Sequence, residues 1–199
     1  MKSDFISRED LETALRLLTR PNRLVCLVCA VTGLRVGDVL SFKTDSFRQR
    51  MTVREAKTGK PKRIYIPKAL FEAVRAQAGR VWVFEGGRDS AKHRTRQAVW
   101  WDLKRAARAF RFRQNVSVHS IRKLYAAQLQ DAGYSVDEIQ KELNHSSPEI
   151  TLIYLLARMD YERRLETGAG GCLKAPARKR RTGPNYHRAK TKNVPKKQH

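Results

Sequence analysis

The sequence predicts a mainly α-helical domain of the α+β class, in which the helices pack with one small antiparallel β-sheet or hairpin. Apolar residues recur at helical spacing up to about residue 40, and again from Thr95 onward. Between these regions, "MTVREAKTGKPKRIYIP" shows two short β-type runs around a centre rich in Gly, Pro and Lys. No internal repeat is visible, and 41% hydrophobic residues in 199 suffice for one core.

The N-terminal region predicts three helices. Ser7 with Asp10 resembles a capping box that opens the first one, which should run to about residue 18. Pro21 begins a second, apolar helix that ends at Gly33, a typical C-cap residue. A third, short helix starts near Arg35.

The remaining elements follow in order. "KTGKPK" is expected to form the basic tip of the hairpin. Residues 81–84, "VWVF", predict either a short strand or an extended loop. Helical periodicity then predicts helices over roughly 95–110, 118–131, 135–143 and 148–158.

Charge indicates the class of partner. The chain has 42 Lys and Arg against 19 Asp and Glu, a formal net charge of +23, which points to a polyanion such as nucleic acid. Ribosomal proteins and proteins that bind anionic membranes share this composition. Residues 169–199 contain no acid and almost no large aliphatic residue, so we expect a disordered basic tail after a folded domain of residues 1–168.

Cysteine usage and the N-terminus point to a cytoplasmic protein. Cys26 and Cys29 form a C-x-x-C within an apolar helical run, where small core residues are expected and a zinc site is not. The first residues lack the pattern of a signal peptide, and no apolar run approaches the roughly 18 residues of a membrane span.

Several basic residues stand at the ends of predicted elements. Arg35 follows "TGL" at a helix start, where backbone N–H groups favour a phosphate. His119 and Arg122, in "HSIR", share one face at the start of a later helix. Lys57 lies at the hairpin tip. Each of these taken alone is also explained as an ordinary capping, solvated or exposed residue.

Read in order, the motifs "TGLRVGDVL", "KTGK", "HSIRKLYAAQL" and "LNHSSPEITLIYL" resemble the catalytic domain of the tyrosine recombinase (phage integrase) family. That family shows T-G-L-R-x-x-E-L, a hairpin lysine, H-x-L-R, and L-G-H-S-S followed by T-x-x-Y. The resemblance covers about residues 5–160. It implies a DNA recombinase fold and function.

The resemblance implies a role for each matched residue. Arg35 and Arg122 would clamp the non-bridging oxygens of the scissile phosphate, and two fixed guanidiniums suit the charge that builds there. Tyr154 would be the nucleophile, forming a 3′-phosphotyrosyl intermediate and releasing a 5′-hydroxyl. A tyrosine with an ordinary pKa near 10 needs neighbouring cations to attack.

The resemblance also implies the groups that move protons. Lys57 would be the general acid for the leaving oxygen, with Lys60 of the same hairpin as a rival. His119 would transfer protons to and from the tyrosine, and His145 would hydrogen-bond the phosphate. No ATP is expected to be needed, because the phosphotyrosine bond conserves the energy for rejoining the strands. No cofactor or metal ion is expected, because the arginines supply the positive charge that the phosphate requires.

Double-stranded DNA is the implied partner, bound by a homo-oligomer, dimer to tetramer, on paired sites. Asn144 stands where the family usually has glycine, and tolerates the left-handed backbone of that turn. Asp38 replaces the more frequent glutamate after the arginine. The chain also begins where the family's catalytic domain begins, so it is either a compact form or a fragment.

Alternatives remain open from the sequence. A type IB topoisomerase-like enzyme would use nearly the same residues, and a non-catalytic DNA-binding module would need none of the chemistry. Tyr125 is expected in the core, and Tyr161 lies beyond the expected nucleophile position. Basic residues surround Trp100 and Trp101, which would allow these rings to stack on bases, but at least one of them is expected to pack in the interior.

Overall fold

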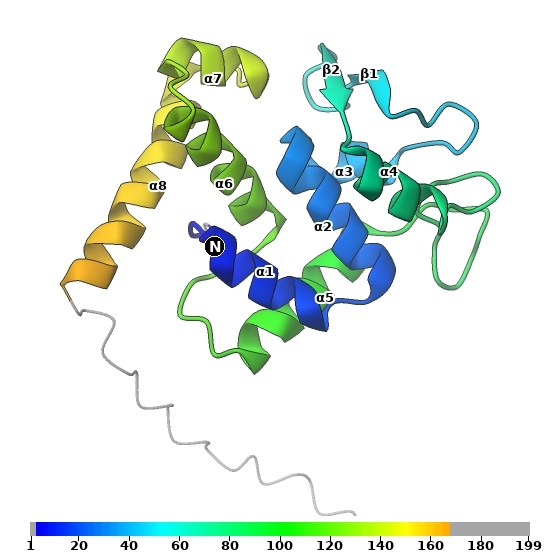
Figure 1. The fold of residues 1–199 in the computed structure, drawn as a ribbon, viewed down its shortest axis with the longest axis horizontal. Helices are drawn as coiled ribbons and strands as arrows, with labels where there is room; N and C mark the ends of the chain where they lie inside the picture. The colour runs from blue at the N-terminus through cyan, green and yellow to red at the C-terminus, as the bar shows by residue number, and fades with distance from the viewer. Residues whose placement is uncertain (1–2, 168–199) are drawn as a thin grey trace, which may run out of the picture.

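A computed structural model describes residues 3–167, so the expected basic tail, residues 169–199, lies outside the described residues. Within this range the elements are α1 (Arg8–Leu17), α2 (Arg20–Thr32), α3 (Val36–Leu40), β1 (Arg50–Arg54), β2 (Pro61–Tyr65), α4 (Lys68–Arg75), α5 (Arg96–Ala109), α6 (Val118–Asp131), α7 (Val136–Glu142) and α8 (Pro148–Glu166). The expected mainly helical class with one small antiparallel sheet is confirmed (Figure 1).

The predicted start and end signals of the N-terminal helices are present. The Ser7 hydroxyl accepts a hydrogen bond from the backbone N–H of Asp10 at 3.1 Å, which caps the start of α1. Gly33 adopts a left-handed backbone (φ 64°) that ends α2. This turn brings the chain directly into α3, with Arg35 as its N-cap residue.

The two strands form a hairpin that projects beside α2 and α3 (Figure 1). They pair antiparallel, from Arg50 opposite Tyr65 to Arg54 opposite Pro61, and residues 55–60 close the loop. Segment 81–84 is an extended loop with one isolated bridge between Lys43 and Trp82, which agrees with the second of the two predicted conformations.

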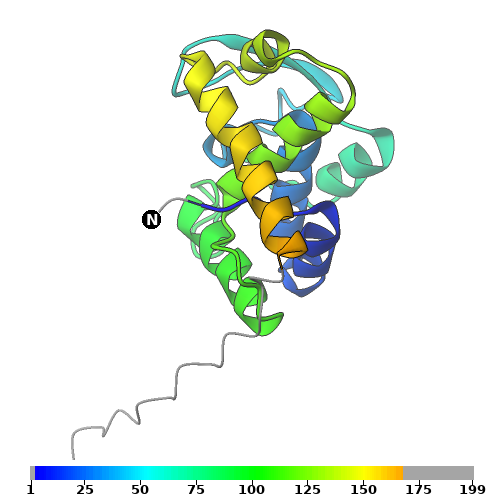
Figure 2. The ribbon, with the colours of Figure 1, turned by 90° about the vertical axis from the view of Figure 1, so that its left-hand side faces the viewer.

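Two features of the helices differ from the sequence-based expectation. α4 was not predicted, because its short apolar pattern follows immediately after a strand and Pro67. α8 continues to Glu166, about two turns beyond the predicted end, and crosses α6 (Figure 2). The extension is mostly exposed, so apolar periodicity could not indicate it.

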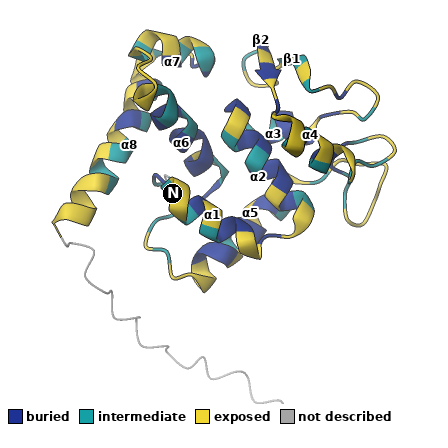
Figure 3. Cartoon of the chain, viewed as in Figure 1, coloured by how far each residue is buried: buried dark blue, intermediate teal, exposed yellow. Residues whose placement is uncertain are grey.

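The core lies where α2, α5 and α6 turn their buried faces toward one another and toward α1 (Figure 3). Cys26 and Cys29 are fully buried there, as expected for small core residues, and burial raises the pKa of the Cys29 thiol to about 12. A smaller cluster joins α6, α7 and α8 through Ala126, Ile139, Leu143 and Leu155. It fixes α8, the helix that carries Tyr154, against α6.

No helix among residues 3–167 combines the length and the apolar character that a membrane crossing requires.

Candidate active site

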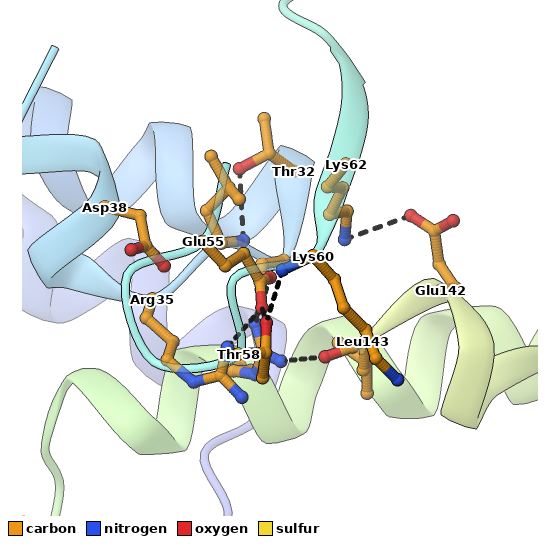
Figure 4. Close-up of polar contacts among 12 residues, drawn as sticks. Thr32, Arg35, Asp38, Glu55, Thr58, Lys60, Lys62, Glu142 and Leu143 are labelled. Atoms are coloured by element: carbon orange, nitrogen blue, oxygen red, sulfur yellow. Dashed lines mark hydrogen bonds and ion pairs between the residues drawn. The ribbon is translucent and has the colours of Figure 1, made fainter. Parts of the chain in front are cut away.

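Arg35 is positioned by the turn between α2 and α3. The left-handed backbone of Gly33 reverses the chain, and the side chain of Leu34 anchors it in the core. Alanine could not replace Gly33 without a clash, since a Cβ atom would lie 2.4 Å from the ring of Tyr125. The guanidinium of Arg35 leaves this turn and donates to the carboxylate of Glu55 (Figure 4).

Arg122 is a buried arginine on α6, with only 2% of its surface exposed. Its Nη1 donates to the carbonyl of Gly33 and its Nη2 to the carbonyl of Leu143. Nη1 also lies 3.8 Å from Oε1 of Glu55. The side chain therefore ties the α2–α3 turn, the hairpin and the end of α7 together. Burial, followed by the charge of Arg35, lowers the pKa of this guanidinium.

One open cavity of about 1270 Å³ brings four predicted site residues together: Arg35, Lys57, His119 and Arg122. They come from the α2–α3 turn, the hairpin loop and the start of α6. The cavity continues along α5, where further basic residues line it: Arg96, Lys104 and Arg108. Its charge and its open shape suit a polyanion.

His119 lies between three cations of this cavity. Its burial first, and then the positive charges of Arg122, Arg35 and Lys57, lower the pKa of the imidazole below its usual value. The ring is therefore neutral near pH 7, which is the state that can accept a proton.

His145 occupies the turn between α7 and α8. Asn144 precedes it with a left-handed backbone (φ 48°), as expected at a position where the family usually has glycine. The ring is buried, and its Nδ1 shares a 2.9 Å hydrogen bond with the hydroxyl of Thr151. Burial, and then the charges of Arg122 and Arg35, lower the pKa of His145 to about 3.

Tyr154 lies on α8, half-buried, with its ring against His145 at a centroid distance of 4.9 Å. The ammonium of Lys123 lies 5.8 Å from the centre of the same ring. Tyr154 and His145 do not line the large cavity; Arg122, which contacts the carbonyl of Leu143, joins them to it. The structure thus groups four of the predicted residues in one cavity and pairs the other two, His145 and Tyr154, through their rings.

The two hairpin lysines have different surroundings. Lys57 lines the large cavity with the arginines. Lys60 lines a separate cavity of about 290 Å³, together with Asn144 and His145. This arrangement favours Lys57 over Lys60 as the residue next to a phosphate held by Arg35.

The two rival tyrosines make other contacts. The hydroxyl of Tyr125 donates to Glu142 at 2.9 Å, and its ring is part of the smaller cluster. The hydroxyl of Tyr161 donates to Asp10 of α1 at 3.2 Å. Both interactions are typical of structural side chains.

The expectation that one tryptophan packs in the interior was wrong. Trp100 is 37% and Trp101 57% exposed, and the two rings contact each other edge to face. Trp100 lines the cavity beside Arg35, because the apolar stripe of α5 that faces the core is formed by smaller residues such as Val99 and Leu103.

Acidic residues near the site were not singled out from the sequence, apart from Asp38. The carboxylate of Glu55, which is fully buried, contacts both arginines. Asp38 accepts the N–H of Ala56 at 2.9 Å, and burial raises the pKa of its carboxyl group. The available signal was a lone acid, Glu55, within an otherwise basic hairpin loop.

Lys62 and Glu142 form a second pair that the sequence did not indicate. The ammonium of Lys62, on β2, is buried and lies 3.1 Å from the carboxylate of Glu142 at the end of α7 (Figure 4). Burial lowers the pKa of this lysine. The pair links the hairpin that carries Lys57 to the helix that precedes His145.

Comparisons with known proteins identify the family of this chain. The model of the phage integrase family matches residues 5–160. The tyrosine recombinase XerA of Thermococcus kodakarensis is 28% identical over 177 residues, which are 82% of this chain and 62% of the relative. The integrase of Escherichia phage P2 is 24% identical over 154 residues, 77% of this chain and 43% of the relative. The chain therefore spans only about half the length of such relatives.

Solved structures show the same fold. A crystal structure of XerA recombinase superposes with a TM-score of 0.64 at 16% identity, over 82% of this chain and 63% of the other. The catalytic domain of bacteriophage HP1 integrase gives a TM-score of 0.58 at 16% identity, over 83% of this chain and 95% of that domain. A XerH site-specific recombinase bound to a palindromic difH substrate gives 0.63 at 18% identity, over 84% and 53%.

Proposed function

Because the chain belongs to the phage integrase family, we propose that it is a site-specific DNA recombinase that cleaves and rejoins strands through a phosphotyrosyl bond on Tyr154. One observation carries the proposal: Arg35, Lys57, His119 and Arg122 line a single basic cavity. The rings of His145 and Tyr154 contact each other edge to face, and Arg122 donates to the carbonyl of Leu143, two residues before His145.

In the proposed reaction, the scissile phosphate enters the cavity and is bound by the guanidinium of Arg35, with Arg122 beneath it. The hydroxyl oxygen of Tyr154 attacks phosphorus, and the bond from phosphorus to the 5′-oxygen breaks. Arginine side chains stabilise the charge on the non-bridging oxygens as the transition state forms. The reaction requires a movement of α8 that brings the Tyr154 hydroxyl to the phosphate, because Tyr154 does not line the cavity.

Proton transfer is assigned to the remaining residues. Neutral His119 accepts the proton of the tyrosine hydroxyl, directly or through a water molecule. Lys57 donates a proton to the departing 5′-oxygen. His145 lines the smaller cavity with Lys60, and the reaction requires it to move with α8, to which its ring is hydrogen-bonded through Thr151. Neutral His145 then hydrogen-bonds a non-bridging oxygen through Nε2, an atom that is buried without a hydrogen-bond partner among the described residues. Rejoining reverses these steps and requires neither ATP nor a metal ion.

The substrate is proposed to be double-stranded DNA, bound by a dimer or tetramer on paired sites. Two relatives of known structure carry DNA in their crystals: XerH with a difH substrate, and a λ integrase dimer with a COC′ core site. The basic cavity along α5 provides a surface of matching charge.

The test uses a library of nicked suicide duplexes with a randomised central sequence. The strand that carries the 5′-hydroxyl is short enough to diffuse away after cleavage, so the protein remains joined to DNA. Covalent complexes are isolated under denaturing conditions in EDTA, without ATP, and sequenced. We expect a tyrosine-linked adduct enriched in one DNA site.

Two variants on the same helix provide the control. Tyr154→Phe should abolish the adduct, whereas Tyr161→Phe should retain it, because Tyr161 bonds to α1. Arg35→Ala should also abolish it and is preferable to an Arg122 variant, since Arg122 supports the fold. An adduct that survives Tyr154→Phe would refute the assigned nucleophile. Adducts without sequence enrichment would instead indicate a topoisomerase-like activity, and DNA binding without any adduct a non-catalytic module.

A further inference from the structure

Glu55 places a fully buried carboxylate between the two arginines of the cavity. Its Oε2 accepts a hydrogen bond from Nη1 of Arg35 (Figure 4). Its Oε1 lies 3.8 Å from Nη1 of Arg122. Within residues 3–167, Oε1 has this ion pair but no hydrogen bond. One carboxylate therefore offsets part of the positive charge of two neighbouring guanidiniums that repel each other.

The carboxylate approaches the arginines from the protein side. Arg35 and Arg122 line the cavity, whereas Glu55 has no exposed surface. A phosphate that enters the cavity would thus meet the guanidiniums on the face opposite to Glu55. It would also experience the negative charge of Glu55 behind them, which opposes the binding of any anion.

Glu55 also belongs to the loop that carries Lys57. Its backbone N–H donates to the carbonyl of Lys60 at 3.0 Å, and its own carbonyl accepts from Gly59 at 2.8 Å. The hydroxyl of Thr58 donates to Oε2 at 3.2 Å. The carboxylate therefore fixes the hairpin loop and Arg35 relative to each other, and with them the position of Lys57.

We propose that Glu55 is a positioning residue: it is the resident counter-ion of the arginine pair, aligning Arg35, Arg122 and the Lys57 loop while weakening the affinity of the cavity for small oxyanions. The inference deepens the proposed function and rests on it for its meaning. A phosphodiester within DNA overcomes the opposing charge through its many other contacts, whereas a lone phosphate ion cannot.

If Glu55 has this role, its removal changes oxyanion affinity and the rate of DNA cleavage in opposite directions. Removal of a purely structural residue would lower both. Removing the charge of Glu55 should strengthen the binding of an oxyanion, because repulsion at a few ångströms inside a protein is large. The same change should slow DNA cleavage by about tenfold to a hundredfold, because displacement of reacting groups by about 1 Å has effects of this size. A variant that is merely damaged would lose both properties.

The test measures binding of inorganic orthophosphate to the full chain by calorimetry and by thermal shift. Glu55→Gln is expected to bind orthophosphate at least about tenfold more tightly than the wild-type protein. The gain should disappear in the double variant Glu55→Gln/Arg35→Ala, which separates this site from other basic surfaces. Glu55→Asp, which keeps the charge, should stay close to wild-type affinity.

Glu142→Gln is the matched control, because it removes a carboxylate of the same region that pairs with Lys62 and contacts neither arginine. Its orthophosphate affinity should change much less. If Glu55→Gln is unstable in chloride buffer, its melting temperature is compared with and without orthophosphate. Orthophosphate should raise this temperature more than it raises that of the wild-type protein, because the ion replaces the missing negative charge.

Equal or weaker orthophosphate binding by Glu55→Gln would overturn the inference, as would a gain of the same size in Glu55→Asp or in Glu142→Gln. None of these measurements uses DNA. The suicide-duplex experiment decides the proposed function separately, so that the two can fail independently.

Discussion

The rings of His145 and Tyr154 meet edge to face, with centroids 4.9 Å apart and planes inclined at 78°. His145 is held from its other side by the hydroxyl of Thr151, which comes from the first turn of α8. The helix that carries the tyrosine thus also fixes the histidine. Any movement of α8 that delivers Tyr154 to a phosphate would carry Thr151 with it.

The first prediction concerns acid stability. Burial lowers the pKa of His145 to about 3 in the folded protein, against an ordinary value of about 6.5 when unfolded. Below pH 6.5 the unfolded chain binds a proton that the folded protein does not, so stability is complete above this pH and is lost as the pH falls toward 3. At pH 5 the loss from this group should be about 2 kcal/mol.

Urea unfolding at pH 7 and pH 5 measures this contribution. His145→Gln should show a smaller decrease in the free energy of unfolding between the two pH values than the wild-type protein. The carboxylates and His119 titrate in both proteins, so their contributions cancel in the difference. Identical pH dependence in the two proteins would show that His145 is not held neutral.

The second prediction separates the two hairpin lysines. Lys57→Ala should reduce the cleavage of suicide DNA by about a hundredfold or more, as is usual when a general acid is removed. Lys60→Ala should have a much smaller effect, because Lys60 lines the other cavity. With a 5′-bridging sulfur in place of oxygen, the leaving thiolate needs no proton, so the Lys57→Ala rate should recover. If the sulfur substrate restored the cleavage rate of Lys60→Ala and not that of Lys57→Ala, Lys60 would be the general acid.

The third prediction concerns the fold. Arg122→Ala should lower the free energy of unfolding by about 3–5 kcal/mol, because it removes one of the two cations beside the buried carboxylate of Glu55 and leaves two backbone carbonyls without their donor. Arg105 forms an ion pair with Asp102, and its side chain is 57% exposed. Arg105→Ala should therefore lower the free energy of unfolding by about 1 kcal/mol or less. Chemical denaturation of both variants makes the comparison; similar losses would contradict the buried role.

The fourth prediction tests the turn before His145. Asn144 has φ 48°, a conformation that glycine adopts without strain and alanine does not. Asn144→Gly should therefore change the free energy of unfolding by less than about 0.5 kcal/mol, whereas Asn144→Ala should cost about 1 kcal/mol. Thermal melts of the two variants suffice. Equal stability of both would mean that the turn relaxes to another conformation.

Local signals predicted most of the fold. The cap at Ser7, the left-handed Gly33 and the hairpin around Gly59 each depend on a few neighbouring residues, which the sequence displays directly. α4 was missed because it is short and directly follows a strand and Pro67, and the end of α8 was missed because it is mostly exposed. The exposure of Trp100 was missed for a related reason, since periodicity cannot say which of two adjacent aromatic residues faces a cavity.

The sequence by itself determined the family and the helical class and supplied candidates for the site residues, because four motifs in a fixed order are visible in one dimension. Only the tertiary structure decided which of those residues meet. Lys57 and Lys60 stand in the same hairpin motif, where the resemblance favoured Lys57, and they line different cavities in the structure. Glu55 gained a role only when folding placed it between Arg35 and Arg122, since Coulomb interactions act over distances in space and not along the chain.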